Sequence, residues 1–238
     1  MLNPIIRVRE RVETGRSDSD TTLSTDLMYY GELVVKLTVA GLIGAVEDDR
    51  ERSRYRLLHG LVRADGIGDW AKALDDILAG PAARRLNDEA RIESRELFER
   101  CGEGSWQYDA CSLMHSCIRV VDSDFEDIPA KLDGRRWAHY FARLRNKTRG
   151  HGAALTSRLA EICPALEQSI RQFTDNFWLF EREWVYLHRN LSGKYRVTKL
   201  SETDRGFDEL KSAQVQRGLK IDPQNDYCQR LAEQLRVK

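Results

Sequence analysis

Apolar residues recur at helical spacing along most of this 238-residue chain. They follow one another at steps of three and four, which places them on one face of an α-helix. The pattern predicts helices at 27–46, 48–65, 68–81, 88–100, 106–121 and 133–148, and a long core helix from about 155 to 177 that Pro164 either kinks or divides. We therefore expect a mainly α fold, a multi-helix bundle.

The segment 27–46 is apolar enough and long enough to cross a membrane. Glu32 and Lys36 lie inside it, and charged side chains are costly at the centre of a bilayer. A helix that is apolar nearly all round also suits the middle of a bundle, and residues 24–26 offer capping side chains just before it. We therefore expect a buried core helix and no membrane-spanning segment.

The two ends of the chain differ from its middle. Residues 1–21 are polar and lack the long apolar region of a signal peptide, so we expect a polar lead-in that could be mobile. Residues 22–181 hold the expected helical domain. Beyond it, two β-rich runs flank the turn-forming residues 190–193, which predicts a β-hairpin. Residues 182–238 are expected to form a small α+β appendage with a last helix at 224–236.

Charge and cysteine content limit the classes of function. The chain has 38 Lys and Arg against 38 Asp and Glu, so no global field attracts it to nucleic acid or to an anionic membrane. Any basic function must therefore be local. The five cysteines are odd in number and widely spaced, which suits reduced thiols in the cytoplasm and not a disulfide framework. We expect a cytoplasmic protein.

One short stretch, YFARLRNKTRGHGAAL at 140–155, departs from this balance. Within nine residues and without an acid it holds Arg143, Arg145, Lys147, Arg149 and His151. The apolar stripe of the preceding helix is formed by Trp137, Tyr140, Phe141 and Leu144. Helical geometry places Arg145 at the border of this buried stripe, and Arg143 and Lys147 nearer solvent. Gly150 then permits a turn that brings His151 to the foot of the long core helix.

The string Arg145 to His151, RNKTRGH, resembles the Arg-x(4–6)-His motif of the HEPN superfamily, in the form with Asn directly after the Arg. The resemblance extends over about 22–180 as a fold and over 145–151 as matched residues. Members of that family are commonly metal-independent endoribonucleases of toxin–antitoxin, abortive-infection, CRISPR and RNA-processing systems. They are helical bundles that usually work as dimers with facing motifs. The resemblance implies that Arg145 and His151 form a catalytic pair oriented by Asn146, with no cofactor and no metal.

These residue types suit cleavage of RNA through its own 2′-hydroxyl. An imidazole can accept the proton of that hydroxyl or donate one to the 5′-leaving oxygen. A guanidinium fork can bind two oxygens of the crowded phosphorane. Flanking phosphates would be held by Arg143, Lys147 and Arg149, which makes binding dependent on salt. The expected partners are RNA, a second copy of the chain in a homodimer, and an antitoxin or other defence-system protein.

Other interpretations stay open. A HEPN-like bundle could bind RNA, a nucleotide or a protein without cutting, or serve as an oligomerisation module of a larger complex. Basic residues before a glycine are also a usual helix ending. The pattern Cys111, His115 and Cys117 could suggest zinc, but on a helix Cys117 points away from Cys111 and no fourth ligand is apparent, which favours packing. Packing or surface roles are likewise expected for His59, His139 and His188, although His139 shares the basic helix and could line an RNA seam.

Overall fold

The computed structural model describes residues 2–47, 52–64, 66–150, 156–189, 195–200 and 207–210, some of them at the backbone only. Eight α-helices make up most of this part of the chain: α1 (Asn3–Asp18), α2 (Asp20–Gly44), α3 (Ser53–Val62), α4 (Ile67–Leu78), α5 (Arg91–Phe98), α6 (Trp106–Val121), α7 (Arg135–Arg145) and α8 (Thr156–Asn176). Shorter helical turns are η1 (Pro81–Arg85), η2 (Asp88–Ala90), η3 (Asn146–Gly150) and η4 (Trp178–Glu181). The fold is mainly α-helical, as the periodicity predicts.

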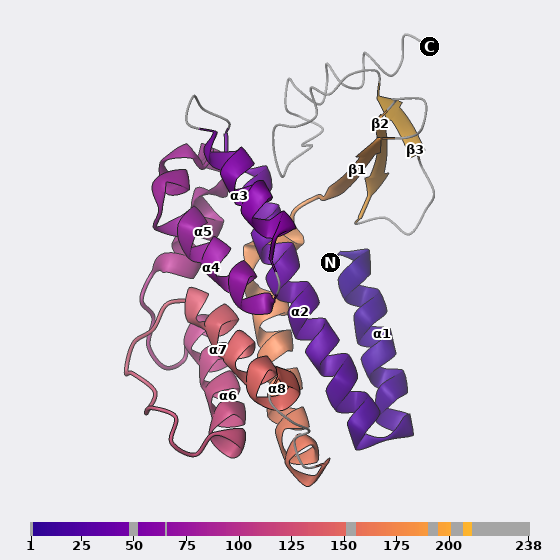
Figure 1. Ribbon diagram of the computed structural model, residues 1–238, viewed down its shortest axis with the longest axis vertical. Coiled ribbons are helices and arrows are strands. Elements are labelled where there is room, and N and C mark those ends of the chain that lie inside the picture. The colour runs from indigo at the N-terminus through magenta and orange to yellow at the C-terminus, as the bar shows by residue number, and fades with distance from the viewer. Residues whose placement is uncertain are drawn as a thin grey trace.

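Helix α2 is the centre of the bundle, and α1, α4 and α8 pack around it (Figure 1). By length and composition α2 could cross a membrane, but 61% of its most apolar window is buried inside the protein. The expected core helix is therefore confirmed. It begins earlier than predicted, because the Ser19 side chain accepts a hydrogen bond from the Thr22 N–H and caps the helix there. Ser24 and Asp26 are buried within α2 instead of capping it.

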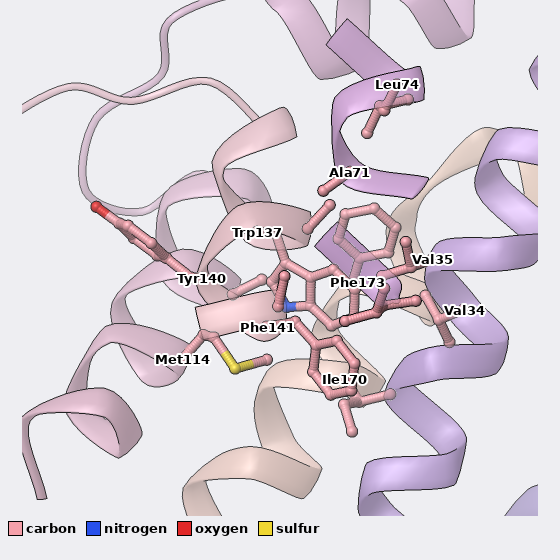
Figure 2. Close-up of a cluster of buried hydrophobic side chains, with 14 of the residues drawn as sticks. Val34, Val35, Ala71, Leu74, Met114, Trp137, Tyr140, Phe141, Ile170 and Phe173 are labelled. Carbon is pink, nitrogen blue, oxygen red and sulfur yellow. The ribbon is translucent and has the colours of Figure 1, made fainter. Parts of the chain in front are cut away.

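An aromatic cluster in the core joins α7 to α8. Figure 2 shows Trp137 and Phe141 of α7 beside Phe173 of α8, and the ring centres of Trp137 and Phe173 are 4.5 Å apart. The Trp137 Nε1–H donates to Ser169 Oγ at 2.9 Å, and that hydroxyl donates to the Ala110 carbonyl of α6 at 2.7 Å. These bonds satisfy the polar atoms of a buried cluster, which would otherwise cost free energy. Helix α8 continues through Pro164 as one element.

Helix α1 replaces the polar lead-in expected for residues 1–21. Ile5 and Val12 of α1 are buried against the bundle. The Arg9 guanidinium donates from Nε to Tyr30 Oη at 2.7 Å and from Nη2 to Thr174 Oγ1 at 2.6 Å, which ties α1 to α2 and α8. A narrow apolar stripe and hydrogen-bonded cations thus hold the segment in place. The expectation of a mobile lead-in is wrong for the residues of α1.

Helix α3 does not bury all of its apolar residues. Its sequence places Tyr55, Leu58 and Val62 on one face, but these side chains are 56%, 46% and 86% exposed. The helix instead packs on α4 and η1 through Leu57 and Leu61, which are only partly buried. A short helix at the edge of a bundle buries only part of its apolar face. The spacing of apolar residues therefore predicts that the helix exists but does not show which side of it packs against the bundle.

The expected hairpin follows η4. Strand β1 (Val185–Arg189) pairs antiparallel with β2 (Tyr195–Lys199), and β3 (Phe207–Leu210) adds to the other edge of β2. The sheet is attached to the helical part through the backbone, since the Asn3 N–H donates to the Leu200 carbonyl at 2.7 Å and the Leu200 N–H to the Trp184 carbonyl at 2.8 Å. The helix predicted at 224–236 lies outside the described residues, and the domain boundary near 182 stays a prediction.

Candidate functional site

Arg145 is the last residue of α7, and a close approach of α7 to α2 sets its position. Gly31 of α2 has no side chain, and the Phe141 ring occupies the space beside it: an added Cβ would lie 2.0 Å from Phe141 Cε2. Phe141 and Arg145 share a face of α7, while Glu32 directly follows Gly31 on α2. The Arg145 Nε therefore donates to Glu32 Oε1 at 3.1 Å.

Glu32 links two cations at this contact. Its second carboxylate oxygen is 3.9 Å from the Lys36 ammonium one turn further along α2, and that ammonium lies 5.9 Å from the centre of the Trp70 ring. The Glu32 side chain is 15% exposed and that of Arg145 is 30% exposed. The border position predicted for Arg145 is thus confirmed. The contact also explains why charged residues interrupt the apolar run of α2.

Arg143 and Lys147 occupy the other shoulder of the basic stretch and share one carboxylate. Asp122, at the carboxyl end of α6, has its Oδ2 2.7 Å from Arg143 Nη2 and 3.3 Å from the Lys147 Nζ. The Arg143 guanidinium also lies 4.5 Å above the centre of the Phe125 ring. The hydrogen bond from Arg143, and after it the one from Lys147, lowers the pKa of Asp122. A stretch without acids in the sequence is therefore paired with acids in space.

The residues after Arg145 continue α7 as the π-helical turn η3. Its Thr148 is buried and donates from Oγ1 to the Leu144 carbonyl at 2.9 Å, whereas Asn146 is exposed. Wide turns of this kind are rare and occur frequently at functional sites. Arg149 is described at the backbone only, and His151 lies outside the described residues. The pairing of Arg145 with His151 consequently stays a prediction.

The Cys-His-Cys pattern on α6 takes part in packing. His115 Nε2 is 2.7 Å from the Glu126 carbonyl oxygen, and the His115 ring lies against Phe125. The Cys117 thiol faces the Ile162 carbonyl of α8, and burial raises its pKa to about 12. Across the described ranges, no three His, Cys, Asp or Glu side chains are grouped as a metal site would require. These contacts support the packing interpretation over zinc.

His139 is positioned by α4. Its Nε2 lies 2.8 Å from Asp75 Oδ2, and Arg135, one turn earlier on α7, is 3.4 Å from the other oxygen of the same carboxylate. The two α7 side chains therefore fasten α7 to α4. The position of His139 on the basic helix led to the expectation that it could line an RNA seam. Such a contact with RNA would have to form beside the contact between His139 and Asp75.

A surface groove of about 430 Å³ lies between α3, α4 and η1. Its apolar lining comes from residues such as Leu57 and Ala82, and its charged rim includes Arg56, Lys72 and Asp76. Of the described side chains in the basic stretch, Arg143, Arg145 and Lys147, none lines this groove. The groove and the site around Arg145 are thus separate features of the surface.

Two residues of the site were not identified from the sequence, namely Glu32 and Asp122. The sequence contains one indication that Glu32 has a special role, because a Glu and a Lys four residues apart interrupt an otherwise apolar helix. Asp122 opens an acidic loop that resembles solvated surface. Neither pairing could be assigned from the sequence, since the partners are 113 and 21 residues away along the chain.

Comparisons with known proteins add no family to this geometry. No protein-family model matches the chain, and searches of curated proteins and of solved structures returned no match. The functional argument therefore rests on the residues and contacts described above, together with the resemblance of RNKTRGH to the HEPN motif.

Proposed function

We propose that the protein is a metal-independent endoribonuclease of HEPN type that acts in the bacterial cytoplasm, in antiphage defence or in a toxin-like growth arrest. The observation that carries this proposal is the setting of Arg145. Its Nε is hydrogen bonded to Glu32, and its side chain is 30% exposed at the end of α7, directly before a π-helical turn. A guanidinium has five N–H donors, so this bond orients the fork and uses only one of them.

The proposed reaction breaks the bond between phosphorus and the 5′-oxygen of an RNA linkage. The 2′-oxygen attacks phosphorus while its proton passes to a base, and the departing 5′-oxygen receives a proton from an acid. His151 takes one of these two roles, because an imidazole exchanges protons near neutral pH. Arg145 stabilises the additional negative charge on the phosphorane oxygens. The products are a 2′,3′-cyclic phosphate and a 5′-hydroxyl.

A homodimer would complete this chemistry. One chain supplies one motif histidine, whereas the reaction needs both a proton acceptor and a proton donor. Two facing motifs supply two histidines and two arginines. The dimer is a consequence of the resemblance and of this need for two proton-transfer groups. Sedimentation or light scattering at micromolar protein tests it, and a monomer would contradict the composite site.

A second function is favoured by a different observation. Arg143, Arg145 and Lys147 are each paired with a carboxylate of their own chain, and a purely structural role accounts for these contacts. A HEPN-like bundle that binds RNA, a nucleotide or a protein without cutting, or that mediates assembly of a larger complex, would have the same contacts. The two functions differ in whether the exposed fork of Arg145 acts on a phosphate.

Cleavage of a labelled mixed-sequence RNA in EDTA separates the two functions. Wild type is compared with Arg145→Ala, Arg145→Lys and His151→Ala, with Arg91→Ala as a matched control because Arg91 is an exposed arginine of α5. The proposal expects cyclic phosphate ends from wild type and from the control. It expects a loss of about 10²-fold or more in the His151 variant. The cleavage activity of Arg145→Lys should be as low as that of Arg145→Ala, since the lysine ammonium is a point charge and cannot bind two phosphate oxygens as a guanidinium does.

Folding of each variant is checked by circular dichroism and thermal unfolding. A wild-type protein that leaves RNA intact in EDTA, or a His151→Ala variant as active as wild type, would refute the nuclease proposal. Wild-type binding of RNA without cleavage would favour the non-catalytic module.

A further inference from the structure

Asp122 forms a cradle with the two flanking cations that matches the way proteins bind a phosphate oxygen. One oxygen, Oδ2, lies 2.7 Å and 3.3 Å from Nη2 and Nε of Arg143 and 3.3 Å from Nζ of Lys147. Three donors from an arginine and a lysine on one anionic oxygen are the contacts that a phosphate would receive. The carboxylate therefore stands where an oxygen of an RNA phosphate would be bound.

The backbone of Asp122 is anchored, and the cations that hold its carboxylate are exposed. The Asp122 N–H donates to the Ile118 carbonyl at 2.7 Å, which anchors the residue to the last turn of α6, and its side chain is 14% exposed. Arg143 and Lys147 are 45% and 44% exposed. Long, exposed cationic side chains can exchange one anion for another by rotating. Cations that can leave the carboxylate are what a displaceable contact requires.

The segment after Asp122 adds a second restraint on the same guanidinium. Phe125 is buried, its ring packs against Tyr140 at 5.5 Å, and it forms the surface beneath Arg143. An arginine that lies over an aromatic ring keeps its N–H groups free to meet an oxygen in the plane of the guanidinium. The ring thus orients the guanidinium whichever anion it binds.

We propose that Asp122 occupies a phosphate-binding position of the RNA site within the chain itself, so that RNA must displace its carboxylate before Arg143 and Lys147 can bind a phosphate. This inference rests on the proposed function, in which both cations hold phosphates that flank the cut. Asp122 is then an affinity-determining residue: it lowers RNA affinity without touching the reacting atoms. Replacing Asp122 by an uncharged residue should therefore raise the affinity of the site for RNA.

The test is a titration of a fluorescently labelled mixed-sequence single-stranded RNA over a range of salt concentrations. Its 2′-hydroxyls are methylated, so that the proposed cleavage, which EDTA would not stop, cannot consume the probe. Wild type is compared with Asp122→Asn, and the matched control is Asp124→Asn. Asp124 is an exposed acid of the same loop, so its removal changes net charge equally while leaving the cradle intact. Asp122→Ala serves as a second variant, because an Asn oxygen can still accept from Arg143. Arg143→Gln combined with Asp122→Asn tests dependence on the cation.

Binding of one phosphate in the place of the carboxylate should steepen the slope of log affinity against log salt by about 0.7, the value for one phosphate contact with a single strand. The advantage of Asp122→Asn over wild type should accordingly shrink about 2.6-fold between about 50 and 200 mM salt. Asp124→Asn should keep the wild-type slope. Adding Arg143→Gln to Asp122→Asn should reduce the steepening, because Arg143 supplies two of the three donors of the cradle.

Equal affinities and slopes for the Asp122 and Asp124 variants would overturn the inference, because only net charge would then matter. Weaker binding by Asp122→Asn would overturn it too and would make Asp122 a residue that orders the cations. Absence of binding in every protein also overturns it. The cleavage assay tests the proposed nuclease activity independently of this inference. If wild type does not cleave RNA but Asp122→Asn binds RNA more tightly than wild type does, the nuclease proposal is refuted and the inference about Asp122 is supported.

Discussion

Replacing Gly31 by alanine should destabilise the protein, although alanine is the better helix former. The added Cβ would lie 2.0, 2.4 and 2.7 Å from three atoms of the Phe141 ring, whereas carbon atoms normally approach to about 3.5–4.0 Å. Phe141 is fully buried and its ring stacks on Trp137 at 5.8 Å. The ring must therefore retreat by about 1.5 Å into a filled core.

The expected loss follows from two opposing terms. Forcing a methyl group into a packed core costs up to about 3 kcal/mol, and replacing glycine by alanine in a helix returns about 1 kcal/mol. The net loss of unfolding free energy is about 2 kcal/mol, which for a chain of this length lowers Tm by about 4–8 °C. Gly60→Ala is the matched control. An added Cβ at Gly60 in α3 meets nothing within 4 Å, so alanine should stabilise the protein there.

Urea and thermal unfolding of both variants measure the difference. Phe141→Leu, which removes the ring, should make Gly31→Ala less costly in the double variant than in wild type. A Gly31→Ala protein as stable as wild type would refute the close approach. It would also remove the argument that this approach brings Arg145 to Glu32.

Three further predictions concern other parts of the molecule. Arg182→Met should cost about 3–5 kcal/mol in urea unfolding, because it leaves the Glu93 carboxylate buried without its cation; a loss under about 1 kcal/mol would contradict that buried pair. Cys101, which is partly exposed, should react with a disulfide reagent in the native state well before Cys117, whose pKa burial raises to about 12, and equal rates would contradict that burial. The folded-state pKa of Asp122 lies below the unfolded value of about 3.9, so its stabilisation is present above that pH and is lost as the pH falls through the folded value. The Asp122→Asn variant should therefore be less stable than wild type at neutral pH, and the difference should shrink as the pH falls below about 3.9; a difference that does not change with pH would contradict the ion pair.

The helices that periodicity predicts are those whose apolar stripe is wide. The stripe of α7 and the apolar run of α2 were both read correctly from spacing. Helix α1 was missed because long-range polar contacts contribute much of its docking: Arg9 binds Asp175 and Arg16 binds Glu167, over 150 positions away. Sequence spacing carries no information about such partners.

The candidate site likewise contains residues whose position the sequence predicts and residues whose position it does not. Helical geometry alone placed Arg145 at the edge of the buried face and Arg143 nearer solvent, and the exposed fractions of both side chains confirm this. The carboxylates that meet these cations come from two other helices, α2 and the end of α6. Their approach depends on how the helices pack, and the glycine that permits one of them is an ordinary residue in the sequence. No local sequence pattern could therefore identify the acidic partners.

The central position of α2 has a consequence for synthesis of the chain. This helix is made early, but α8, one of its main covering helices, begins about 110 residues after α2 ends. At about 5–20 residues per second, the ribosome leaves this apolar surface without that cover for about 5 to 20 s. In that interval α2 has the length and hydropathy of a membrane span. The nascent chain is therefore expected to need protection by a chaperone that binds apolar segments, and slower translation across α3 to α7 would lengthen that need.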